Sequence, residues 1–456
     1  MPTGITKAAP SPTPPGTFVN TVHQRTGLML GVPDKVTWRR ALLTGDALAV
    51  RARSLGNSRY GTPAVAATGP AEPEVTTGPK GLGPGQRTAL AWKIHPRPEE
   101  PVMRAARYYA RHDVRIDEIP EPELRPGTVA IDVAWCGICG TDLHEYLEGP
   151  IFIPPHGSPH PISGEEAPVT LGHELSGTIT ALGDGVDGLE VGQGVVVEPY
   201  IIRDDVDTGP GQAYQLSKDM NFIGLGGRGG GLAEKIVVQR RWVHPVGDVP
   251  LDQAALIEPL SVGHHAFVRS GAKAGDVAIV GGAGPIGLLT AAVLRASGLT
   301  VYVSELSAAR KQMARDTGVA DDVFDPRDGD VAQKVRDVTG GRGADVGFEC
   351  SSVAPVLDML LDAVRPGGVI VNVSIWGHKP EVDLPALVLK EIDLRGTIGY
   401  ANDHPATIAL VQSGKVDLAP FITARIGLDG LITEGFEQLI TNNEHHVKIL
   451  VDPRAR

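Results

Sequence analysis

The pattern of hydrophobic and polar positions divides the chain into three stretches. Residues 1–102 hold no sustained apolar period and are rich in proline and glycine, as in APSPTPPG and GPKGLGPGQ, so they predict a disordered extension. From Met103 onward, short runs of alternating apolar and polar residues are separated by Pro/Gly turns, which predicts β-strands. After about residue 250, apolar strands alternate with helical patterns, which predicts a doubly wound parallel sheet.

These patterns predict an α/β fold in three parts. A disordered Pro/Gly-rich extension spans 1–102, a β-rich domain spans 103–258, and a doubly wound α/β domain spans 259–399. The last stretch, 400–456, contains the strand-like HVKILVDP, and we expect it to return to the β-rich domain.

Charge and cysteine content narrow the classes of function. The 456 residues carry a formal net charge of -12, which argues against nucleic acid and against an anionic membrane as partners. Three cysteines cannot form a disulfide framework and suit a reducing compartment, so we expect a cytoplasmic protein. Residues 277–294 are uncharged, but their clustered glycines and Pro285 predict a strand, a turn and a buried helix instead of a membrane span.

A glycine-rich loop follows the first strand of the α/β region. VAIVGGAGPIGLL places Gly282, Gly284 and Gly287 in the G-x-G-x-x-G pattern, with Pro285 and Ile286 between the last two glycines. A strand before the loop and a helix after it are the context that a dinucleotide fingerprint requires. The helix N-terminus then faces the pyrophosphate, so these five residues are predicted to bind a nicotinamide dinucleotide.

The acid after the next strand indicates which dinucleotide is bound. Glu305 lies eighteen residues after the last glycine of the loop, where a carboxylate can bind the ribose hydroxyls and repel a 2′-phosphate. This favours NAD over NADP. Arg310 is also predicted to bind the cofactor. Because Arg310 and Lys311 are basic and lie close to Glu305 in the sequence, NADP stays open as an alternative coenzyme.

A candidate metal site comes from residues in separate motifs. Cys136 and Cys139 in CGICGTDLH are consistent with half of a structural zinc site, a redox dithiol, or a coincidental pair. His173 and Glu174 in LGHELSG, placed beside Cys139, would complete a thiolate, imidazole and carboxylate set for zinc. LIEPLSVGHH adds Glu258, and a catalytic zinc with an open position needs only three or four protein ligands.

Taken in order, these motifs resemble the zinc-dependent medium-chain dehydrogenase/reductase family. WCGICGTDLHEYLEGPIFIP and EHHVKILVDP look like its 2,3-butanediol dehydrogenase branch, which is close to the sorbitol and threonine dehydrogenases. The resemblance covers Met103 to the C-terminus. It implies a GroES-like β-rich catalytic domain joined to a Rossmann domain.

The resemblance also implies a metal and a reaction. It makes Cys139, His173, Glu174 and Glu258 the metal residues, and it makes Cys136 a packing residue. Relatives often carry a four-cysteine lobe after the VVVEPY strand, but that region holds no cysteine here, so we expect one catalytic Zn²⁺ per chain. The implied reaction is NAD-dependent oxidation of a small vicinal diol or secondary alcohol, of the 2,3-butanediol/acetoin type.

Other substrates and one other class of protein stay open at this point. A sorbitol-like polyol or L-threonine would be oxidised by the same chemistry. A non-catalytic nucleotide-binding protein of the same fold is the alternative class. For all of these we expect a small-molecule partner, neither nucleic acid nor membrane, and a homodimer or homotetramer.

Proton transfer is expected to involve residues just after the metal cysteine. Thr141 can relay the proton of the substrate hydroxyl and His144 can pass it to water, while Asp142 is a candidate partner for the ring of His173. Glu258 is open to three roles: a direct zinc ligand, a ligand through water, or a partner for the second hydroxyl of the substrate.

Overall fold

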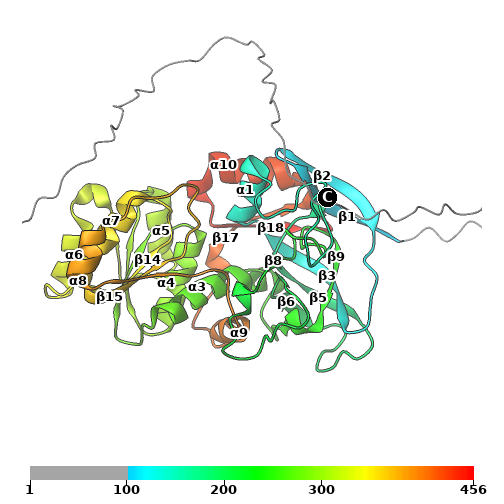
Figure 1. Cartoon of the computed structure of the whole chain (residues 1–456), viewed down its shortest axis with the longest axis horizontal. Helices are drawn as coiled ribbons and strands as arrows, with labels where there is room; N and C mark the ends of the chain where they lie inside the picture. The colour runs from blue at the N-terminus through cyan, green and yellow to red at the C-terminus, as the bar shows by residue number, and fades with distance from the viewer. Residues whose placement is uncertain (1–100, 456) are drawn as a thin grey trace, which may run out of the picture. The chain divides into compact units, whose positions relative to one another are not determined.

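The computed structural model describes residues 101–455 (Figure 1). The predicted disordered extension, 1–102, therefore lies outside the described residues except for its last two. The first strand, β1, begins at Val102 and pairs with β2 in antiparallel register.

The sheets in the first part of the described chain are built mostly from antiparallel strand pairs. Three strands pair in the order β2-β1-β4, and β7 pairs with β8. A larger sheet runs β10-β6-β5-β3-β18-β17 with β9 also on β3, and it takes in β17 (Ile422–Gly427) and β18 (Lys448–Asp452), which pair with each other in parallel. Val129, Ile131 and Val133 of β3 are fully buried, as the two-residue period of a half-buried strand requires. The strands of this part are β1 (Val102–Ala110), β2 (Asp113–Pro120), β3 (Thr128–Gly137), β4 (Val169–Thr170), β5 (Glu174–Leu182), β6 (Gly194–Val197), β7 (Tyr200–Ile201), β8 (Asn221–Phe222), β9 (Lys235–Gln239) and β10 (Val243–Pro245).

Helices connect these strands and lead into the next part. The helices here are α1 (Gly140–Glu148), η1 (Tyr214–Leu216), η2 (Arg240–Trp242), α2 (Leu251–Ala254) and α3 (Ile257–Ser270). α3 ends at Ser270 and is capped by Gly271, whose φ of 70° is a left-handed conformation that glycine adopts without strain.

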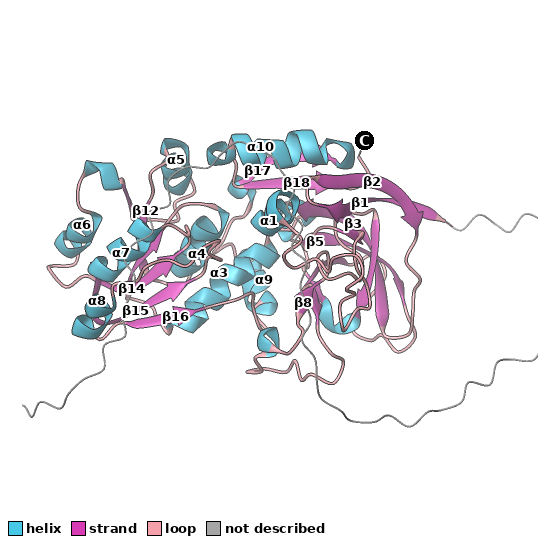
Figure 2. Ribbon diagram, turned by 45° about the horizontal axis from the view of Figure 1, so that its top comes forward, coloured by secondary structure: helices cyan, strands magenta, loops and turns pink. Residues whose placement is uncertain are grey.

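The second part is a six-stranded parallel sheet in the order β13-β12-β11-β14-β15-β16 (Figure 2). This is the strand order of a doubly wound dinucleotide-binding fold. Its central strand β11 is buried along nearly its whole length, as expected where helices cover a parallel sheet. The elements are β11 (Val277–Gly281), α4 (Pro285–Ala296), β12 (Thr300–Ser304), α5 (Ala308–Asp316), β13 (Asp322–Phe324), η3 (Pro326–Asp328), α6 (Val331–Val338), β14 (Ala344–Glu349), α7 (Ala354–Ala363), β15 (Val364–Asn372), α8 (Leu384–Lys390) and β16 (Asp393–Gly396).

The C-terminal stretch returns to the first sheet. β18 pairs antiparallel with β3, so that Val451 lies opposite Cys136 and Leu450 opposite Gly137. This pairing brings the end of the chain beside the cysteine motif. The elements are α9 (His404–Gln412), η4 (Ala419–Phe421), β17 (Ile422–Gly427), η5 (Leu428–Gly430), the π-helical turn η6 (Leu431–Phe436), α10 (Glu437–Thr441), η7 (Asn443–His445) and β18 (Lys448–Asp452).

The predicted α/β fold, with a β-rich part followed by a Rossmann sheet, is confirmed. The uncharged stretch 277–294 forms β11, a turn and most of α4, as the glycines predicted. Within residues 101–455, no helix is long and apolar enough to cross a membrane. The limits assigned to the individual domains stay a prediction.

Candidate active site

Cys139 stands at the N-terminus of α1, in extended conformation with φ -94° and ψ 156°. Its backbone N–H donates to Asp142 Oδ2 at 2.9 Å, which closes the first turn of the helix and fixes where the cysteine lies. The cysteine Sγ lies 3.7 Å from Thr141 Oγ1. The thiol, the hydroxyl and the carboxyl are therefore held together by a single helical turn.

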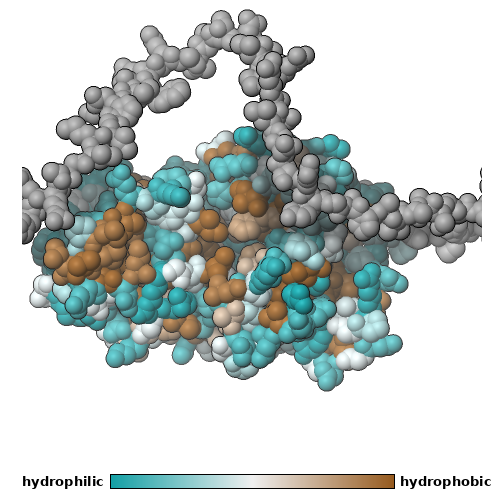
Figure 3. Space-filling view, viewed as in Figure 1, coloured by the Kyte–Doolittle hydropathy of each residue, from teal (hydrophilic) through white to brown (hydrophobic). Residues whose placement is uncertain are grey.

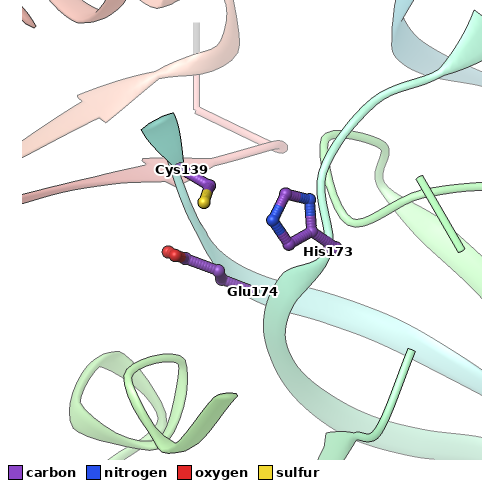
Figure 4. A group of neighbouring side chains, drawn as sticks. All are labelled: Cys139, His173 and Glu174. Carbon is purple, nitrogen blue, oxygen red and sulfur yellow. The ribbon is translucent and has the colours of Figure 1, made fainter. Parts of the chain in front are cut away.

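His173 and Glu174 face this cysteine from the start of β5. One potential ligand atom from each of Cys139, His173 and Glu174 lies within 4.8 Å of the others, and Figure 4 shows the three side chains around a common space. Glu174 pairs with Gly137 across β3 and β5, and a Cβ at Gly137 would collide with its carboxylate. The glycine between the two cysteines is therefore required by packing.

Asp142 lies behind the imidazole of His173. Nδ1 of the ring is 3.7 Å from Asp142 Oδ1, and neither of these buried atoms has a hydrogen-bond partner within the described residues. Burial opposes the charged imidazolium, but the charges of Asp142 and Cys139 outweigh it and raise the pKa of His173 well above its usual value. A ring whose Nδ1 is turned to a carboxylate leaves Nε2 as the donor for a metal.

Glu174 is held by a lysine from the far end of the chain. Lys448 of β18 donates to Oε1 at 2.7 Å and Oε2 at 2.6 Å of the Glu174 carboxylate, and to the carbonyl of Ile138 at 3.2 Å. The side chains of both partners are at most 3% exposed. Burial disfavours the charged lysine, but Glu174 outweighs this and raises the pKa of Lys448. The carboxylate is thus neutralised where it meets the cysteine and the histidine.

Glu258 occupies the first turn of α3 and does not belong to the group of three. The hydroxyl of Tyr400 donates to its Oε1 at 2.7 Å. Burial, reinforced by the charge of Glu174, raises the pKa of Glu258 to about 7, while His173 opposes the shift. The pKa of Glu258 thus responds to the charges of two residues of the candidate metal site. Which of its three roles it plays stays a prediction.

The two residues of the predicted proton relay differ in exposure. Thr141 is half-buried beside the cysteine sulfur, whereas His144, one turn further along α1, is exposed. No hydrogen bond joins the two side chains within the described residues. Thr141 therefore lies beside the Cys139 sulfur and His144 lies at the solvent-exposed side of α1, and a proton relay through these two residues stays a prediction.

The glycine loop has the geometry that a dinucleotide needs. Gly282 has φ 96°, a left-handed conformation that strains other residues, and a Cβ at Gly287 would collide with the carbonyl of Gly282. A Cβ at Gly284 would meet no atom within 4 Å, so the loop is open there. Pro285 and Ile286 begin α4, whose N-terminus faces that space.

Glu305 follows β12 directly and reaches back to this loop. Its Oε2 accepts from the N–H of Ala283 at 2.7 Å, and its Oε1 accepts from the N–H of Ser307 at 2.7 Å. Arg310 turns instead toward the C-terminal stretch, donating to the carbonyl of Asn443 at 3.2 Å. The structure therefore brings Glu305, but not Arg310, into contact with the glycine loop.

The residues of the candidate site fit a zinc ion. Thiolate, imidazole and carboxylate are its usual ligands, and a carboxylate behind the ligand imidazole is its usual outer partner. Cys136, by contrast, is fully buried on β3, with its sulfur 3.6 Å from the carbonyl of Gly137. Among the residues described here, only the Cys139, His173 and Glu174 group has the spacing of a metal site.

The sequence motifs do not predict Lys448 and Tyr400 as residues of the site. Lys448 carries a signal in the sequence, because this charged residue directly precedes the apolar run ILV within the strand KILVD. Tyr400 carries no such signal. Its role depends on a contact with a residue 142 positions away.

Comparisons with known proteins agree with this arrangement. Residues 125–248 match the alcohol dehydrogenase GroES-like domain, and residues 285–413 match the zinc-binding dehydrogenase family. The chain is 66% identical over 352 residues to (R,R)-butanediol dehydrogenase of Neisseria gonorrhoeae, covering 77% of this chain and 99% of the relative. It is 30% identical over 356 residues to sorbitol dehydrogenase of Bacillus subtilis, covering 77% and 97%.

A solved structure supports the same grouping. The crystal structure of 2R,3R-butanediol dehydrogenase from Bacillus subtilis superposes with a TM-score of 0.73 at 43% identity, covering 77% of this chain and all of that one. The chain therefore belongs to the zinc-dependent medium-chain dehydrogenase/reductase family, as its motifs predicted.

Proposed function

We propose that this protein is an NAD- and zinc-dependent dehydrogenase that interconverts (R,R)-2,3-butanediol and acetoin. The observation that carries the proposal is the buried group of Cys139, His173 and Glu174 in a chain 66% identical to an (R,R)-butanediol dehydrogenase. The complete ligand set and the open glycine loop favour an enzyme over a non-catalytic nucleotide-binding protein.

The side chains of the site divide the work of binding. Cys139 and His173 would hold the metal, with Glu174 in or near its ligand shell, and Asp142 would orient the imidazole. Zinc, when bound, supplies a Lewis acid that makes the alkoxide of the substrate accessible near neutral pH, and NAD, when bound, supplies the hydride acceptor. The glycine loop would hold the pyrophosphate at the N-terminus of α4.

The proton of the alcohol needs a route out of a buried site. The Thr141 hydroxyl, beside the cysteine sulfur, would accept it, and the exposed His144 would release it to water. Glu258, a buried carboxylate whose pKa responds to Glu174 and His173, would bind the metal, a water or the second hydroxyl of a diol.

A panel of alcohols with each coenzyme tests the function. We expect (2R,3R)-butanediol with NAD to give a kcat/KM at least tenfold above its stereoisomers, sorbitol and L-threonine. The kcat/KM with NAD should exceed that with NADP by about tenfold or more, which corresponds to about 1.4 kcal/mol. The reason is that the Glu305 carboxylate beside the loop repels a 2′-phosphate. Faster turnover of sorbitol or threonine would reassign the substrate, and no turnover of any alcohol would reject the enzyme.

We also propose that the protein assembles as a homodimer or homotetramer. Helix α8 presents Leu384, Val388 and Leu389 with 62%, 73% and 83% exposure, and Leu394 of the edge strand β16 beside it is 40% exposed. Figure 3 shows apolar residues gathered over the region where Figure 1 places α7 and α8. Such a patch on a water-facing surface favours association with another copy. Light scattering on the purified protein would test this, and a monomer at micromolar concentration would contradict it.

We propose a cytoplasmic location as well. Cys136, Cys139 and Cys350 are all free thiols, and an intact thiolate at Cys139 is needed to hold zinc. Cell fractionation would test this, and recovery of the enzyme outside the cytoplasm would contradict it.

A further inference from the structure

A tyrosine that lies far from the metal motifs in sequence contacts the candidate site through Glu258. Tyr400 is fully buried, Glu258 is 6% exposed, and the phenol donates to Glu258 Oε1 at 2.7 Å. Within the described residues, this phenol is the only hydrogen-bond donor to the carboxylate. A buried carboxylate with a single donor depends on that donor for its orientation.

Tyr200 fixes the backbone and packs against the ring of Tyr400. Tyr200, which is fully buried, accepts a hydrogen bond from the backbone N–H of Tyr400 at 3.1 Å and donates one to its carbonyl at 2.8 Å. The two rings pack at 5.2 Å between centroids. Gly399 has φ 53°, and a Cβ there would collide with the Tyr200 hydroxyl. The backbone at Tyr400 is therefore fixed on both of its polar groups.

The residues after Tyr400 attach to the same helix that carries Glu258. Asp403 accepts from Nδ1 of His264 at 2.5 Å and from Nδ1 of His265 at 2.9 Å, both on α3. These histidines lie about two helical turns beyond Glu258. The segment 400–403 thus contacts α3 at two places, at Glu258 and at the two histidines. These contacts fix the position of the segment along the helix axis and therefore the position of the Tyr400 phenol.

We propose that Tyr400 is a positioning residue that orients the Glu258 carboxylate toward the space bounded by Cys139 and His173. The phenol occupies one oxygen and leaves the other for the metal, for water or for the second hydroxyl of a diol. This inference rests on the proposed dehydrogenase function, because it concerns how Glu258 takes part in that reaction. A small displacement of a group in an active site is enough to lower the rate about 10²-fold.

The first experiment compares two buried tyrosines. Tyr400→Phe removes the donor to Glu258. Tyr108→Phe is the matched control, since Tyr108 is 1% exposed and its hydroxyl has no hydrogen-bond partner within residues 101–455. We expect Tyr400→Phe to lower kcat for (2R,3R)-butanediol by about 10- to 100-fold with the KM for NAD and the zinc content unchanged. Tyr108→Phe should stay within twofold of wild type. A Tyr400→Phe variant as active as the control would overturn the proposal.

A double-variant cycle tests whether the effect passes through Glu258. In a Glu258→Gln background, the further change Tyr400→Phe should alter kcat less than twofold, because the group being positioned is already lost. Multiplicative losses would show that Tyr400 acts independently of Glu258 and would overturn the proposal. Should Tyr400→Phe fail to fold, Tyr200→Phe decides in the same cycle: a loss of kcat that vanishes beside Glu258→Gln supports the proposal, and an unchanged kcat contradicts it.

The proposed function and this inference fail in different ways. A wild-type protein that oxidises none of the alcohols with either coenzyme removes the function itself. A wild-type enzyme with the expected activity, together with an active Tyr400→Phe variant, removes only the role given to Tyr400.

Discussion

At the scale of single residues, neighbours in the sequence have unlike roles because their surroundings differ. Cys136 and Cys139 are three positions apart, yet Cys136 is packed inside β3 while Cys139 begins a helix beside an imidazole and a carboxylate. Burial raises the pKa of Cys136 well above its usual value, which keeps that thiol protonated. A protonated, enclosed thiol is a poor metal ligand and a poor nucleophile.

Thr141 gives the residue-scale prediction. Thr141→Ala removes the hydroxyl beside the Cys139 sulfur while leaving the ligand atoms intact, so we expect kcat to fall by roughly 10²–10⁴ with zinc retained. Thr141→Ser keeps the hydroxyl and should stay within about tenfold of wild type. Steady-state kinetics and metal analysis of the two variants check this. Near-wild-type turnover by Thr141→Ala would place the relay elsewhere.

Residues that carry short motifs could be predicted from the sequence, and residues that act through long-range contacts could not. The glycine loop and the Cys139, His173 and Glu174 group were predicted because their patterns are local or belong to a known family. Lys448 and Tyr400 bind Glu174 and Glu258, respectively, from 274 and 142 positions away. Such contacts depend on which strands pair, and no local pattern encodes that.

At the scale of elements, the last strand completes the site. β18 pairs with β3, and this pairing delivers Lys448 to Glu174. The strand itself was predicted from its apolar run, but its partner was not. The segment between β16 and α9 likewise has a spatial partner that its sequence does not predict, because it places Tyr400 against Glu258 of α3.

The buried ion pair gives the element-scale prediction. Lys448→Met leaves the buried Glu174 carboxylate without its ion-pair partner, so we expect the free energy of unfolding to fall by about 3–5 kcal/mol. Removing both charges, with Lys448→Met and Glu174→Leu together, should lower the free energy of unfolding by less than Lys448→Met alone. Denaturant unfolding of the variants measures both.

A half-exposed pair serves as the control for that measurement. Lys235 of β9 pairs with Glu121, and their side chains are 26% and 29% exposed. Lys235→Met should cost about 1 kcal/mol or less, because solvent screens such a pair. If Lys448→Met and Lys235→Met lower the free energy of unfolding equally, the buried ion pair stabilises the fold no more than a surface pair does.

At the scale of the whole molecule, the similarity to dehydrogenases covers only part of the chain. The matches to relatives cover 77% of this chain but 99–100% of the butanediol dehydrogenases from Neisseria gonorrhoeae and Bacillus subtilis. We therefore expect a chain beginning at Met103 to fold and to keep the full kcat/KM. Loss of most activity or of folded protein on this truncation would show that residues 1–102 contribute to the structure. Circular dichroism and steady-state kinetics of the two chains provide the comparison.

The metal content of the purified protein tests the central claim most directly. We expect one zinc per chain, lost together with alcohol oxidation on treatment with a strong chelator, while the chain stays folded because no other group of described residues has the spacing of a metal site. Cys139→Ser should lose both the zinc and the activity, and Cys136→Ser should keep both. Two tightly held zinc ions per chain, or zinc and activity that survive Cys139→Ser, would contradict the account.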